Sequence, residues 1–469
     1  MPTKPKIVTL TNASVDVVNA IRNTASQNYK DHVPIATPDA DSIRSIGAII
    51  MDYPELQNEF LHALVNRIGR VILTSKLYSN PWAEFKKGMM EFGESIEEIF
   101  TEIAKPFQYD PAVAETEIFK REKPNVKSAF HVMNYQKFYK ASIEQRTLGK
   151  AFLAWSGIDE LIASIVNSMY TGANYDEFLT MKYLLARHIL QGDLKVEEIA
   201  DYTDSDNMKS VVTTIKGVSN DMEFLSTKYN RAGVHTYTLK PDQYIIVNAK
   251  FDAKMDVEVL ASAFNMTKAE FMGRRVLIDS FGDIDADRLA ELFADDPTYV
   301  ALTAGEIAAL DAIPAVIVDK DWFMVLDNLM EFTEDYNGQG LYWQYWYHAW
   351  KTFSISPFAN AAVFVPGAPA ISSVTVTPEE AVVMPGQNLQ LTATVATNYF
   401  ASKAVNWTAT INGEAAPDLV DVTPLGVLRT SPDIEAGTEI TVTAKSVVDS
   451  TKTDTATITI YDPSEGGDG

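Results

Sequence analysis

Ile371-Ser-Ser-Val-Thr-Val-Thr-Pro378 is the first of several short segments of this 469-residue chain in which apolar residues alternate with Ser and Thr. Pro366-Gly-Ala-Pro369 separates these segments from a longer part that is rich in aromatic residues. Short strands divided by turn residues are typical of a β-sandwich. We therefore expect an all-β sandwich over residues 368–462 and a flexible tail over 463–469. The other expected strands are Leu389-Gln-Leu-Thr-Ala-Thr-Val395, Val405-Asn-Trp407, Gly426-Val-Leu428, Ile440-Thr-Val-Thr-Ala444 and Thr455-Ala-Thr-Ile-Thr-Ile460.

The N-terminal stretch Met1-Pro-Thr-Lys-Pro-Lys-Ile7 is polar and lacks the apolar region of a secretory signal peptide. No apolar run approaches the roughly 18 residues that span a bilayer, so we expect no membrane partner. Sandwich modules of this kind usually decorate secreted bacterial surface proteins. Their presence on a chain without an export signal therefore needs an explanation.

The composition excludes several classes of function. The chain has no cysteine, which rules out disulfide bonds, thiolate catalysis and cysteine-based zinc sites. Its formal net charge is −24 and its pI is about 4.6. Because so acidic a surface repels nucleic acid, a conventional DNA- or RNA-binding role is not expected. The same repulsion suits a surface that lies near DNA without gripping it.

We expect residues 1–50 to form an arm with one short helix. Val15–Arg22 has helical spacing, but the Ser-, Asn- and Pro-rich stretch that follows offers few apolar positions for a core. A clear helix then opens with Asp52 as its N-cap and Pro54 in its first turn. Its apolar stripe consists of Leu56, Phe60, Leu64, Ile68 and Val71.

Residues 71–105 change to the period of a strand. Val71-Ile-Leu-Thr-Ser-Lys-Leu77 and Ile96-Glu-Glu-Ile-Phe-Thr-Glu-Ile103 predict the two strands of a long β-hairpin. The stretch between them contains glycine and is too polar to bury against its own domain. An exposed hairpin of this length is a liability in a compact enzyme, whereas in an assembly it can hold a neighbour.

Two helices are expected next. Ser156-Gly-Ile-Asp159 is a capping box for the first, and Asn174-Tyr-Asp-Glu177 caps the second, which stops at Gly192. Residues 200–235 are polar and predict irregular structure.

Strands and helices then interleave up to the sandwich without regular βαβ repetition. We therefore expect an α+β fold over residues 51–367. The predicted elements are a strand at Tyr244–Phe251, a capped helix at Thr267-Lys-Ala-Glu270, and strands at Ala315–Leu326, 341–353 and Ala361–Val365.

The sequence contains no catalytic motif. The histidines lack the HxH and HExxH spacings of metal sites, and there is no P-loop, dinucleotide-binding or nucleophile-elbow glycine motif. We therefore predict a protein that is not an enzyme, with no catalytic, cofactor-binding or metal-binding residues and no cofactor. The six histidines are His32, His62, His131, His188, His235 and His348.

Three segments allow a second interpretation. Asp279–Asp287 resembles a cation loop, but it lacks the spacing and closing glutamate of one, so helix caps and turns are favoured. The aromatic run Leu341-Tyr-Trp-Gln-Tyr-Trp-Tyr-His-Ala-Trp350 could stack on sugars or bases. Its strand propensity favours packing in the core or at an interface instead. Lys86-Lys87 could be a basic contact point, although lysines on an exposed turn usually only keep an edge soluble.

Seven segments match one known family in order along the chain. They are Val17-Val-Asn-Ala-Ile-Arg-Asn23, Phe85-Lys-Lys-Gly88, Ile96-Glu-Glu-Ile99, Arg121-Glu-Lys-Pro-Asn-Val-Lys127, Ala263-Phe-Asn-Met266, Val318-Asp-Lys-Asp-Trp-Phe-Met-Val325 and Phe358-Ala-Asn-Ala361. Through them the chain resembles, over nearly its whole length, the major capsid (head) proteins of phi29-like tailed bacteriophages. The C-terminal part resembles a group 2 bacterial Ig-like domain, with Trp407 in the place of that family's core tryptophan. The capsid family also appends such a domain to its subunit.

The resemblance implies a Hong Kong 97-type capsid fold. In this fold, residues 1–50 would form the N-terminal arm and residues 71–105 the extended loop that crosses a neighbouring subunit. Residues 243–313 would belong to the axial domain. The long helices belong to the peripheral domain.

The resemblance also implies partners and a location. Copies of the chain assemble into pentamers and hexamers of an icosahedral or prolate head, with a scaffolding protein and a portal protein. Packaged double-stranded DNA is contacted weakly and without sequence specificity. The chain is made in the host bacterial cytoplasm and ends in the virion. No covalent cross-link is expected, since the Lys–Asn chemistry of some capsid relatives cannot be assigned to particular residues.

Two alternatives remain open at this point. The first is an extracellular Ig-domain adhesin or glycan-binding protein, against which the missing export signal and the exposed hairpin count. The second is a cytoplasmic α+β enzyme, which should show a constellation of site residues and does not.

Overall fold

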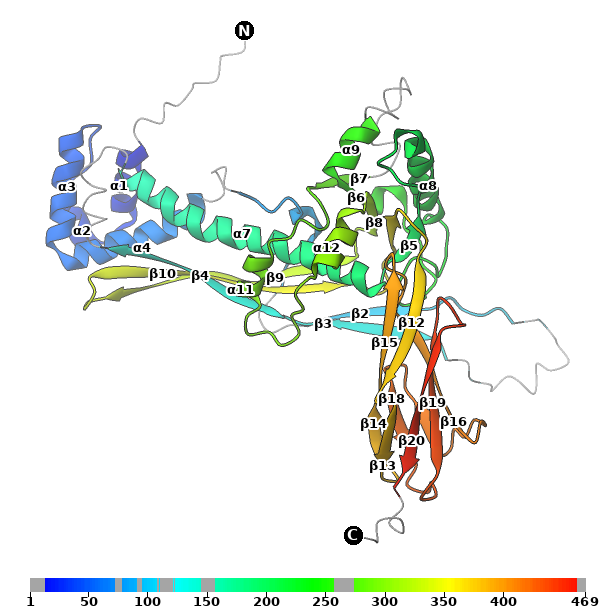
Figure 1. The fold of residues 1–469 in the computed structure, drawn as a ribbon. Coiled ribbons are helices and arrows are strands. Elements are labelled where there is room, and N and C mark those ends of the chain that lie inside the picture. Colours follow the sequence, from blue (N-terminus) through cyan, green and yellow to red (C-terminus); the bar gives the residue numbers. More distant parts are fainter. Residues whose placement is uncertain are drawn as a thin grey trace. The chain divides into compact units, whose positions relative to one another are not determined.

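The computed structural model describes residues 13–71, 78–90, 95–107, 109, 121, 123–144, 157–256 and 274–461 (Figure 1). The chain divides into two compact units. Within the described ranges, no helix is long and apolar enough to cross a membrane. Unit 1 comprises Met1–Glu97, Phe130–Met181 and Met324–Ser354, and unit 2 comprises Glu98–Ala129, Lys182–Phe323 and Ile355–Gly469.

Unit 1 begins with four helices that share one apolar core. They are α1 (Ala13–Thr24), α2 (Gln27–His32), α3 (Ala40–Asp52) and α4 (Pro54–Val71). Ser26 caps α2 by accepting a hydrogen bond from the backbone N–H of Tyr29. Buried residues recur at helical spacing, so each helix turns an apolar stripe inward. These residues include Val18, Ile21, Tyr29, Ile43, Ile46, Ile50, Leu56 and Phe60.

The prediction of a single helix within residues 1–50 is wrong, because α1, α2 and α3 all begin there. The stripe that builds α3 is present as Ile43, Ile46 and Ile50, but the polar residues between them hid it. The helix predicted after Asp52 is confirmed as α4. Asp52 does not cap it, because α3 runs to that residue and only Tyr53 separates the two helices.

The second layer of unit 1 is a four-stranded sheet in the order β1-β9-β10-β4. Its strands are β1 (Lys86–Met89), β9 (Phe323–Asn337), β10 (Tyr342–Ile355) and β4 (Tyr135–Glu144). β10 and β4 are antiparallel, with Tyr342 opposite Glu144 and Lys351 opposite Tyr135. A short 3₁₀ helix, η2 (Ala83–Phe85), leads into β1, which runs parallel to β9.

The aromatic run of residues 341–350 lies in β10, where it packs into the core as the favoured interpretation predicted. Alternate residues Trp343, Tyr345 and Tyr347 are buried. They share a core with Ile165 and Met169 of helix α7, which lies along this sheet (Figure 1). The period of two along β10 therefore gives the sheet one face that is covered by helix.

Helix α7 (Gly157–Gln191) is a single helix of 35 residues, so the two separate helices predicted here are wrong. Asn174 does not cap a second helix; its side-chain amide donates to the carbonyl of Tyr78, 2.9 Å away. The predicted stop at Gly192 is confirmed, since Gly192 has a φ of +75°, which ends a helix readily. Ser156, the predicted N-cap, lies outside the described residues.

One strand of the hairpin predicted within 71–105 pairs with a strand outside that range. The second predicted strand is confirmed as β2 (Ile96–Thr101), but it pairs with β3 (Val126–His131). The Glu102 N–H donates to the Asn125 carbonyl over 2.9 Å, so the end of β2 meets the start of β3. Of the first predicted strand, Val71 ends α4, and 72–77 lie outside the described residues.

The body of unit 2 is a five-stranded sheet in the order β5-β11-β8-β6-β7. β8 is antiparallel to β6 and β11, whereas β5 and β7 run parallel to their neighbours. β6 and β11 are buried along their whole lengths, as expected for strands covered on both faces. The strands are β5 (Lys195–Glu198), β6 (Gln243–Asn248), β7 (Arg274–Ile278), β8 (Ala315–Asp319) and β11 (Ala361–Val365).

The helices of this body correct the prediction for residues 200–235. Met208, Val211, Ile215 and Val218 form a buried stripe on α8, where we expected irregular structure. This i, i+3, i+7 spacing was the signal that the polar composition concealed. The helix predicted at 267–270 lies outside the described residues. The helices are η3 (Ser205–Asn207), α8 (Met208–Asp221), η4 (Lys240–Asp242), α9 (Ala249–Met255), α11 (Ala286–Leu292) and α12 (Ala304–Asp311).

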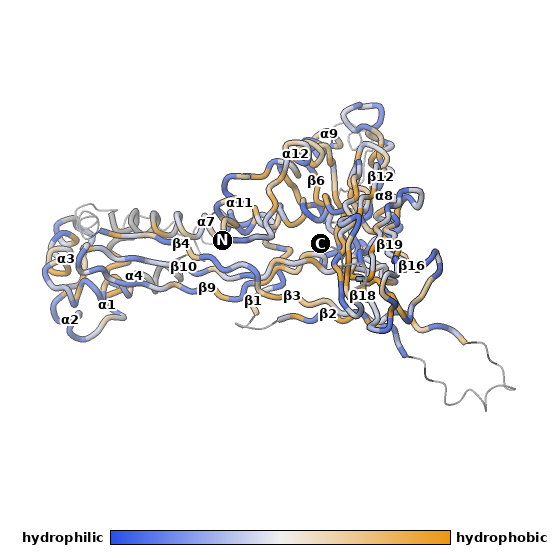
Figure 2. The backbone as a smooth tube through the Cα atoms, turned by 60° about the horizontal axis from the view of Figure 1, so that its bottom comes forward, coloured by the Kyte–Doolittle hydropathy of each residue, from blue (hydrophilic) through white to orange (hydrophobic). Residues whose placement is uncertain are grey.

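After residue 369 every described strand belongs to an all-β module with its own core. The sheets have the orders β12-β15, β13-β20-β19-β16 and β14-β18-β17. Polar and apolar residues mix along these strands (Figure 2), and the buried set includes Leu428, Ile440, Val442 and Ile458. All predicted strands are present, although the one at 389–395 is split at Leu391. The strands are β12 (Ala370–Thr377), β13 (Glu380–Val383), β14 (Asn388–Gln390), β15 (Thr392–Asn398), β16 (Val405–Ile411), β17 (Val420–Val422), β18 (Val427–Thr430), β19 (Glu439–Ser446) and β20 (Thr453–Ile460).

The core of unit 1 yields a test of stability. The hydroxyl of Tyr345 is buried without a hydrogen-bond partner among the described residues, whereas the Tyr139 hydroxyl donates to Asp176 over 2.7 Å. Removing an unpaired buried hydroxyl relieves its desolvation cost, but removing a paired one leaves its partner unsatisfied. We expect Tyr345→Phe to keep or raise the free energy of unfolding. The matched change Tyr139→Phe should lower it by about 1–3 kcal/mol.

Urea unfolding of unassembled subunits measures both values. A loss of stability in Tyr345→Phe equal to that in Tyr139→Phe would contradict the expectation.

Candidate functional site

The histidines and acidic residues form no shared site. Among the described residues there is no group of three or more side chains able to hold a metal ion. In the Asp279–Asp287 segment, Asp279 accepts from Lys182 over 2.6 Å and Asp285 caps α11, as the favoured interpretation predicted. The histidines contact separate partners: His32 contacts Asn28, His62 Glu334, His131 Ser354, His188 Asp193, His235 Glu102 and His348 Thr333.

Four charged side chains meet in the interior of unit 1. Lys351 on β10 lies 2.7 Å from Asp327 on β9 and also contacts Glu177 on α7. Lys86 on β1 lies 2.6 Å from Asp327 and 2.9 Å from Glu177. Asn80 donates to the free oxygen of Glu177 over 2.6 Å. We call Lys86, Glu177, Asp327 and Lys351 the charge cluster.

Lys86 therefore does not lie on an exposed turn, and both interpretations of Lys86-Lys87 are wrong for this residue. Its side chain is mostly buried, and its strand, β1, pairs with the inner strand β9. A sequence pattern of two adjacent lysines gives no indication of this, because the carboxylates that pair with Lys86 lie roughly ninety and two hundred and forty residues further along the chain.

The electrostatics of the charge cluster favour ion pairs over catalysis. Burial opposes the charged form of Glu177, but the nearby Lys351 and Lys86 outweigh it and lower the pKa of this carboxyl. The pKa of Asp327 is lowered in the same way. Burial likewise opposes the charge on Lys351, yet the two carboxylates raise its pKa. All of these groups stay charged at neutral pH, so Lys351 is no nucleophile and the carboxylates are no proton donors.

The hairpin β2–β3 presents two unlike faces. On its inner face Glu98 accepts from the Ser356 hydroxyl over 2.7 Å, and Phe100 stacks on Phe358 with ring centroids 5.5 Å apart. Lys127 donates to the Ala232 carbonyl over 2.6 Å. The outer face has no such cover among the described residues, because exposed and covered positions alternate strictly along both strands.

The uncovered face carries three exposed apolar side chains beside the polar residues Glu97, Thr101 and Ser128. Ile99 is 61% exposed, Phe130 is 64% exposed and Val126 is 51% exposed. Further along the chain Phe107 and Tyr109 are also strongly exposed. Exposed apolar residues gathered on a two-stranded sheet are a common feature of interaction surfaces. We call Ile99, Val126 and Phe130 the outer strip.

The base of the hairpin is fixed by one polar contact. Glu102 accepts a hydrogen bond from His235 Nδ1 over 2.5 Å, and this bond helps to lower the pKa of Glu102 against the opposing effect of desolvation. The sequence analysis named His235 only as a scattered histidine. The alternation in Val126-Lys-Ser-Ala-Phe-His131 was the signal that could have identified the true partner strand of β2.

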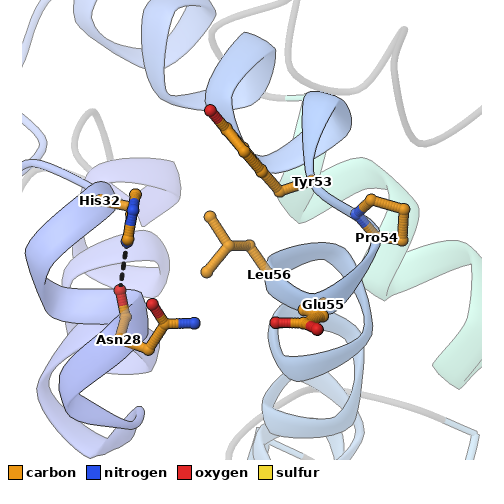
Figure 3. Close-up of a pocket in the computed structure, with 6 residues that line it drawn as sticks. All are labelled: Asn28, His32, Tyr53, Pro54, Glu55 and Leu56. Atoms are coloured by element: carbon orange, nitrogen blue, oxygen red, sulfur yellow. Dashed lines mark hydrogen bonds between the residues drawn. The ribbon is translucent and has the colours of Figure 1, made fainter.

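A small pocket of 480 Å³ lies where α2 meets the turn between α3 and α4 (Figure 3). Leu56 points into the space between His32 and the α3–α4 turn, and His32 Nδ1 lies 2.8 Å from the Asn28 carbonyl. Glu55 lies at the rim. The pocket holds no nucleophile with an adjacent base, so its geometry does not fit acid–base or nucleophilic chemistry.

A buried charge cluster that stabilises the fold and an uncovered apolar strip are typical of structural subunits. Sequence comparison identifies the family. A family model for the phi29-like phage major capsid protein matches residues 18–365. The chain belongs to the family of phi29-like phage major capsid proteins.

Individual relatives agree. The major capsid protein of Bacillus phage PZA is 38% identical over 386 residues, which cover 81% of this chain and 80% of that protein. The major capsid protein of Streptococcus phage Cp-1 is 27% identical over 74% of this chain and 93% of its own length. The solved capsid structure of Staphylococcus phage Andhra is similar with a TM-score of 0.49 and 14% identity, over 63% of this chain and 86% of that one. Membership of this family means that the chain forms a capsid and is a component of the virion, and the adhesin alternative has no support.

The charge cluster yields a prediction about stability. At neutral pH, Lys351→Met leaves two buried carboxylates with only Lys86 to balance them, which should cost about 3–5 kcal/mol of the free energy of unfolding. The pKa values of Glu177 and Asp327 are lowered in the folded protein, so their stabilisation is present above the unfolded values and is lost as the pH falls through the folded ones. The cost of Lys351→Met should therefore shrink as the pH falls below about 4.

Urea unfolding at neutral pH and at about pH 3 measures this difference. The double variant Lys351→Met/Asp327→Leu restores the charge balance and should be more stable than the single variant. A single variant within experimental error of the parent at neutral pH would show that the charge cluster is dispensable.

Proposed function

We propose that this chain builds a Hong Kong 97-type shell in which the β2–β3 hairpin is the extended loop that reaches a neighbouring copy. The observation that carries the proposal is the outer strip of the hairpin, which stays apolar and uncovered while the inner face is held on unit 2. On this proposal α7 and the four-stranded sheet form the peripheral domain. The five-stranded sheet, which includes residues from 243–313, forms the axial domain.

Copies of the chain close into pentamers and hexamers, which together make an icosahedral or prolate head. Each contact in such a shell can be weak, because every copy repeats it and the summed contacts hold the structure. A strip of three exposed apolar side chains suits a contact of this kind. Assembly proceeds on a scaffolding protein and around a portal protein, after synthesis in the host cytoplasm.

The charge of the chain fits a container for DNA. A net charge of −24 leaves little surface that could neutralise phosphates, so packaged double-stranded DNA is contacted weakly and without sequence specificity. Weak contact lets the DNA enter and leave. No catalytic step is part of this function.

The module after residue 369 is proposed to be an Ig-like domain that decorates the outer surface of the shell. Trp407 packs at the edge of its core, close to Gly426 on the opposite sheet. Lysis of the host delivers a phage particle outside the cell, where a surface-type module can act. The module reinforces contacts between capsomers or attaches weakly to host surfaces.

Substitution in the outer strip tests the role of the hairpin. Phe130→Asp places a charge where a neighbour is proposed to pack, and burying an unpaired carboxylate there is strongly unfavourable. We expect the subunit to keep its circular dichroism spectrum and unfolding midpoint but to form few or no shells with a co-produced scaffolding protein. Negative-stain electron microscopy counts the shells.

The matched control is Leu425→Asp, which puts the same charge on an exposed apolar residue of the C-terminal module. This variant should assemble normally. Normal assembly of Phe130→Asp, or a parent chain that stays monomeric under all conditions, would overturn the proposal.

Truncation tests the accessory role of the module. A chain that ends at Gly367 keeps all of the residues matched by the family model, so it should still form shells of normal diameter. Electron microscopy of particles made with and without residues 368–469 measures this. Failure of the truncated chain to assemble, while its circular dichroism spectrum shows a folded protein, would mean that the module is required for the shell.

A further inference from the structure

A groove in unit 2 differs in charge from the rest of the chain. Its volume is 810 Å³, and it lies between the body loops at 191–196 and 228–231 and the module loops at 401–404 and 447–448. The body loop and the module loop approach each other closely at Gly192, since a Cβ at this residue would lie only 2.5 Å from the Cα of Ser402. A groove this large accommodates a short stretch of extended peptide.

The lining is basic. It contains four cations, Lys195, Lys228, Arg231 and Lys403, against one carboxylate, Asp193. Asp193 already accepts from His188 over 2.7 Å and lies 3.2 Å from Nε of Arg231, so its charge is largely satisfied within the chain. Lys195 lies 3.8 Å from Glu197 and Arg231 lies 3.2 Å from Asp193, but the side chains of both cations remain about half exposed. On a chain with a net charge of −24 this groove is a local attractor for anions.

We propose that the groove binds an acidic peptide segment, namely residues 462–469 of a second copy of this chain. This segment reads Asp462-Pro-Ser-Glu-Gly-Gly-Asp-Gly469 and places a carboxylate at every third residue. It contains no cation, so it complements the groove in charge. The contact goes beyond the proposed shell interfaces, which use the outer strip.

Chain geometry keeps the first two carboxylates of the segment, Asp462 and Glu465, out of the groove of their own copy, because the five residues from Ile460 to Glu465 reach only about 18 Å. In the β19–β20 hairpin, Lys445 lies opposite Thr453 near the groove, and Glu439 lies opposite Thr459 at the other end. Residues 453 to 460 span about 24 Å at 3.4 Å per residue. Asp462 follows Ile460 by two residues, which reach only about 7 Å. The acidic residues nearest the module therefore cannot enter the groove of their own copy.

Binding of a synthetic peptide tests the proposal on unassembled subunits. The probe is a fluorescent peptide of residues 461–469, titrated into a chain that lacks residues 462–469. We expect saturable binding that weakens at least tenfold between about 50 mM and about 500 mM salt, because screening shortens the reach of the charges. Charge reversal in Lys228→Glu/Lys403→Glu should weaken it at least tenfold.

The matched control is Lys209→Glu/Lys452→Glu, which makes the same change in net charge outside the groove. Equal affinity of the two double variants would overturn the proposal, as would a peptide that does not bind the parent. Stronger binding of a single-stranded oligothymidylate of equal charge would also overturn it, since the groove would then favour nucleic acid. None of these outcomes depends on shell formation, so they are independent of the proposed function.

Cysteine pairing tests the assignment to a second copy. The chain has no cysteine of its own, so introduced thiols report single contacts. Ala404→Cys lines the groove, and Ser464→Cys lies in the acidic segment. When the two single variants are mixed and oxidised, we expect a disulfide-linked heterodimer on a non-reducing gel. A Lys209→Cys variant in place of Ala404→Cys should give none, and equal yields from both mixtures would contradict the proposal.

Discussion

The charge cluster is the constraint on which unit 1 depends. Lys86, Glu177, Asp327 and Lys351 come from four separate segments of the chain, and each loses its water when α7 packs on the sheet. The desolvation cost of such ions is repaid only when every partner is in position. A sheet slipped by one residue would turn Lys351 away from Glu177 and leave buried charges unpaired. The cluster therefore selects the register of β9 and β10 against α7 more than it adds stability.

This dependence explains which parts of the fold the sequence predicted. Strands with a period of two were predicted well, including β10 and those of the C-terminal module, because the pattern that buries one face is local. The pairing partner of β2 was missed, since alternation shows that a segment is a strand without showing which strand lies beside it. The charge cluster was missed for the same reason. Lys86 pairs with residues that are distant in sequence, and a lysine in a polar stretch looks exposed.

Helices were missed where composition masked their spacing. α3 and α8 carry complete apolar stripes, but serines, threonines and charged residues between them gave the stretches a polar average. α7 was divided in two because Asn174 has the chemistry of a cap. In the folded chain its amide binds the Tyr78 carbonyl instead, which is a tertiary contact that no local rule contains. The error at α7 therefore arose because a polar side chain binds a distant partner instead of capping its own helix.

In the proposed shell, acidic charge pushes neighbouring copies apart and exposed apolar surface draws them together. The balance of these two effects accounts for where charged and apolar residues lie on the surface. Copies with a net charge of −24 repel one another. Scattered ion pairs between two acidic surfaces therefore could not hold the copies together in place of an apolar contact. The hairpin concentrates the exposed apolar residues Ile99, Val126 and Phe130 on one narrow face, while its inner face is held by Glu98 and Lys127. A strip this narrow attracts a neighbour only when the two copies are oriented correctly. Acidic repulsion elsewhere then disfavours the misaligned contacts that would trap an incomplete shell.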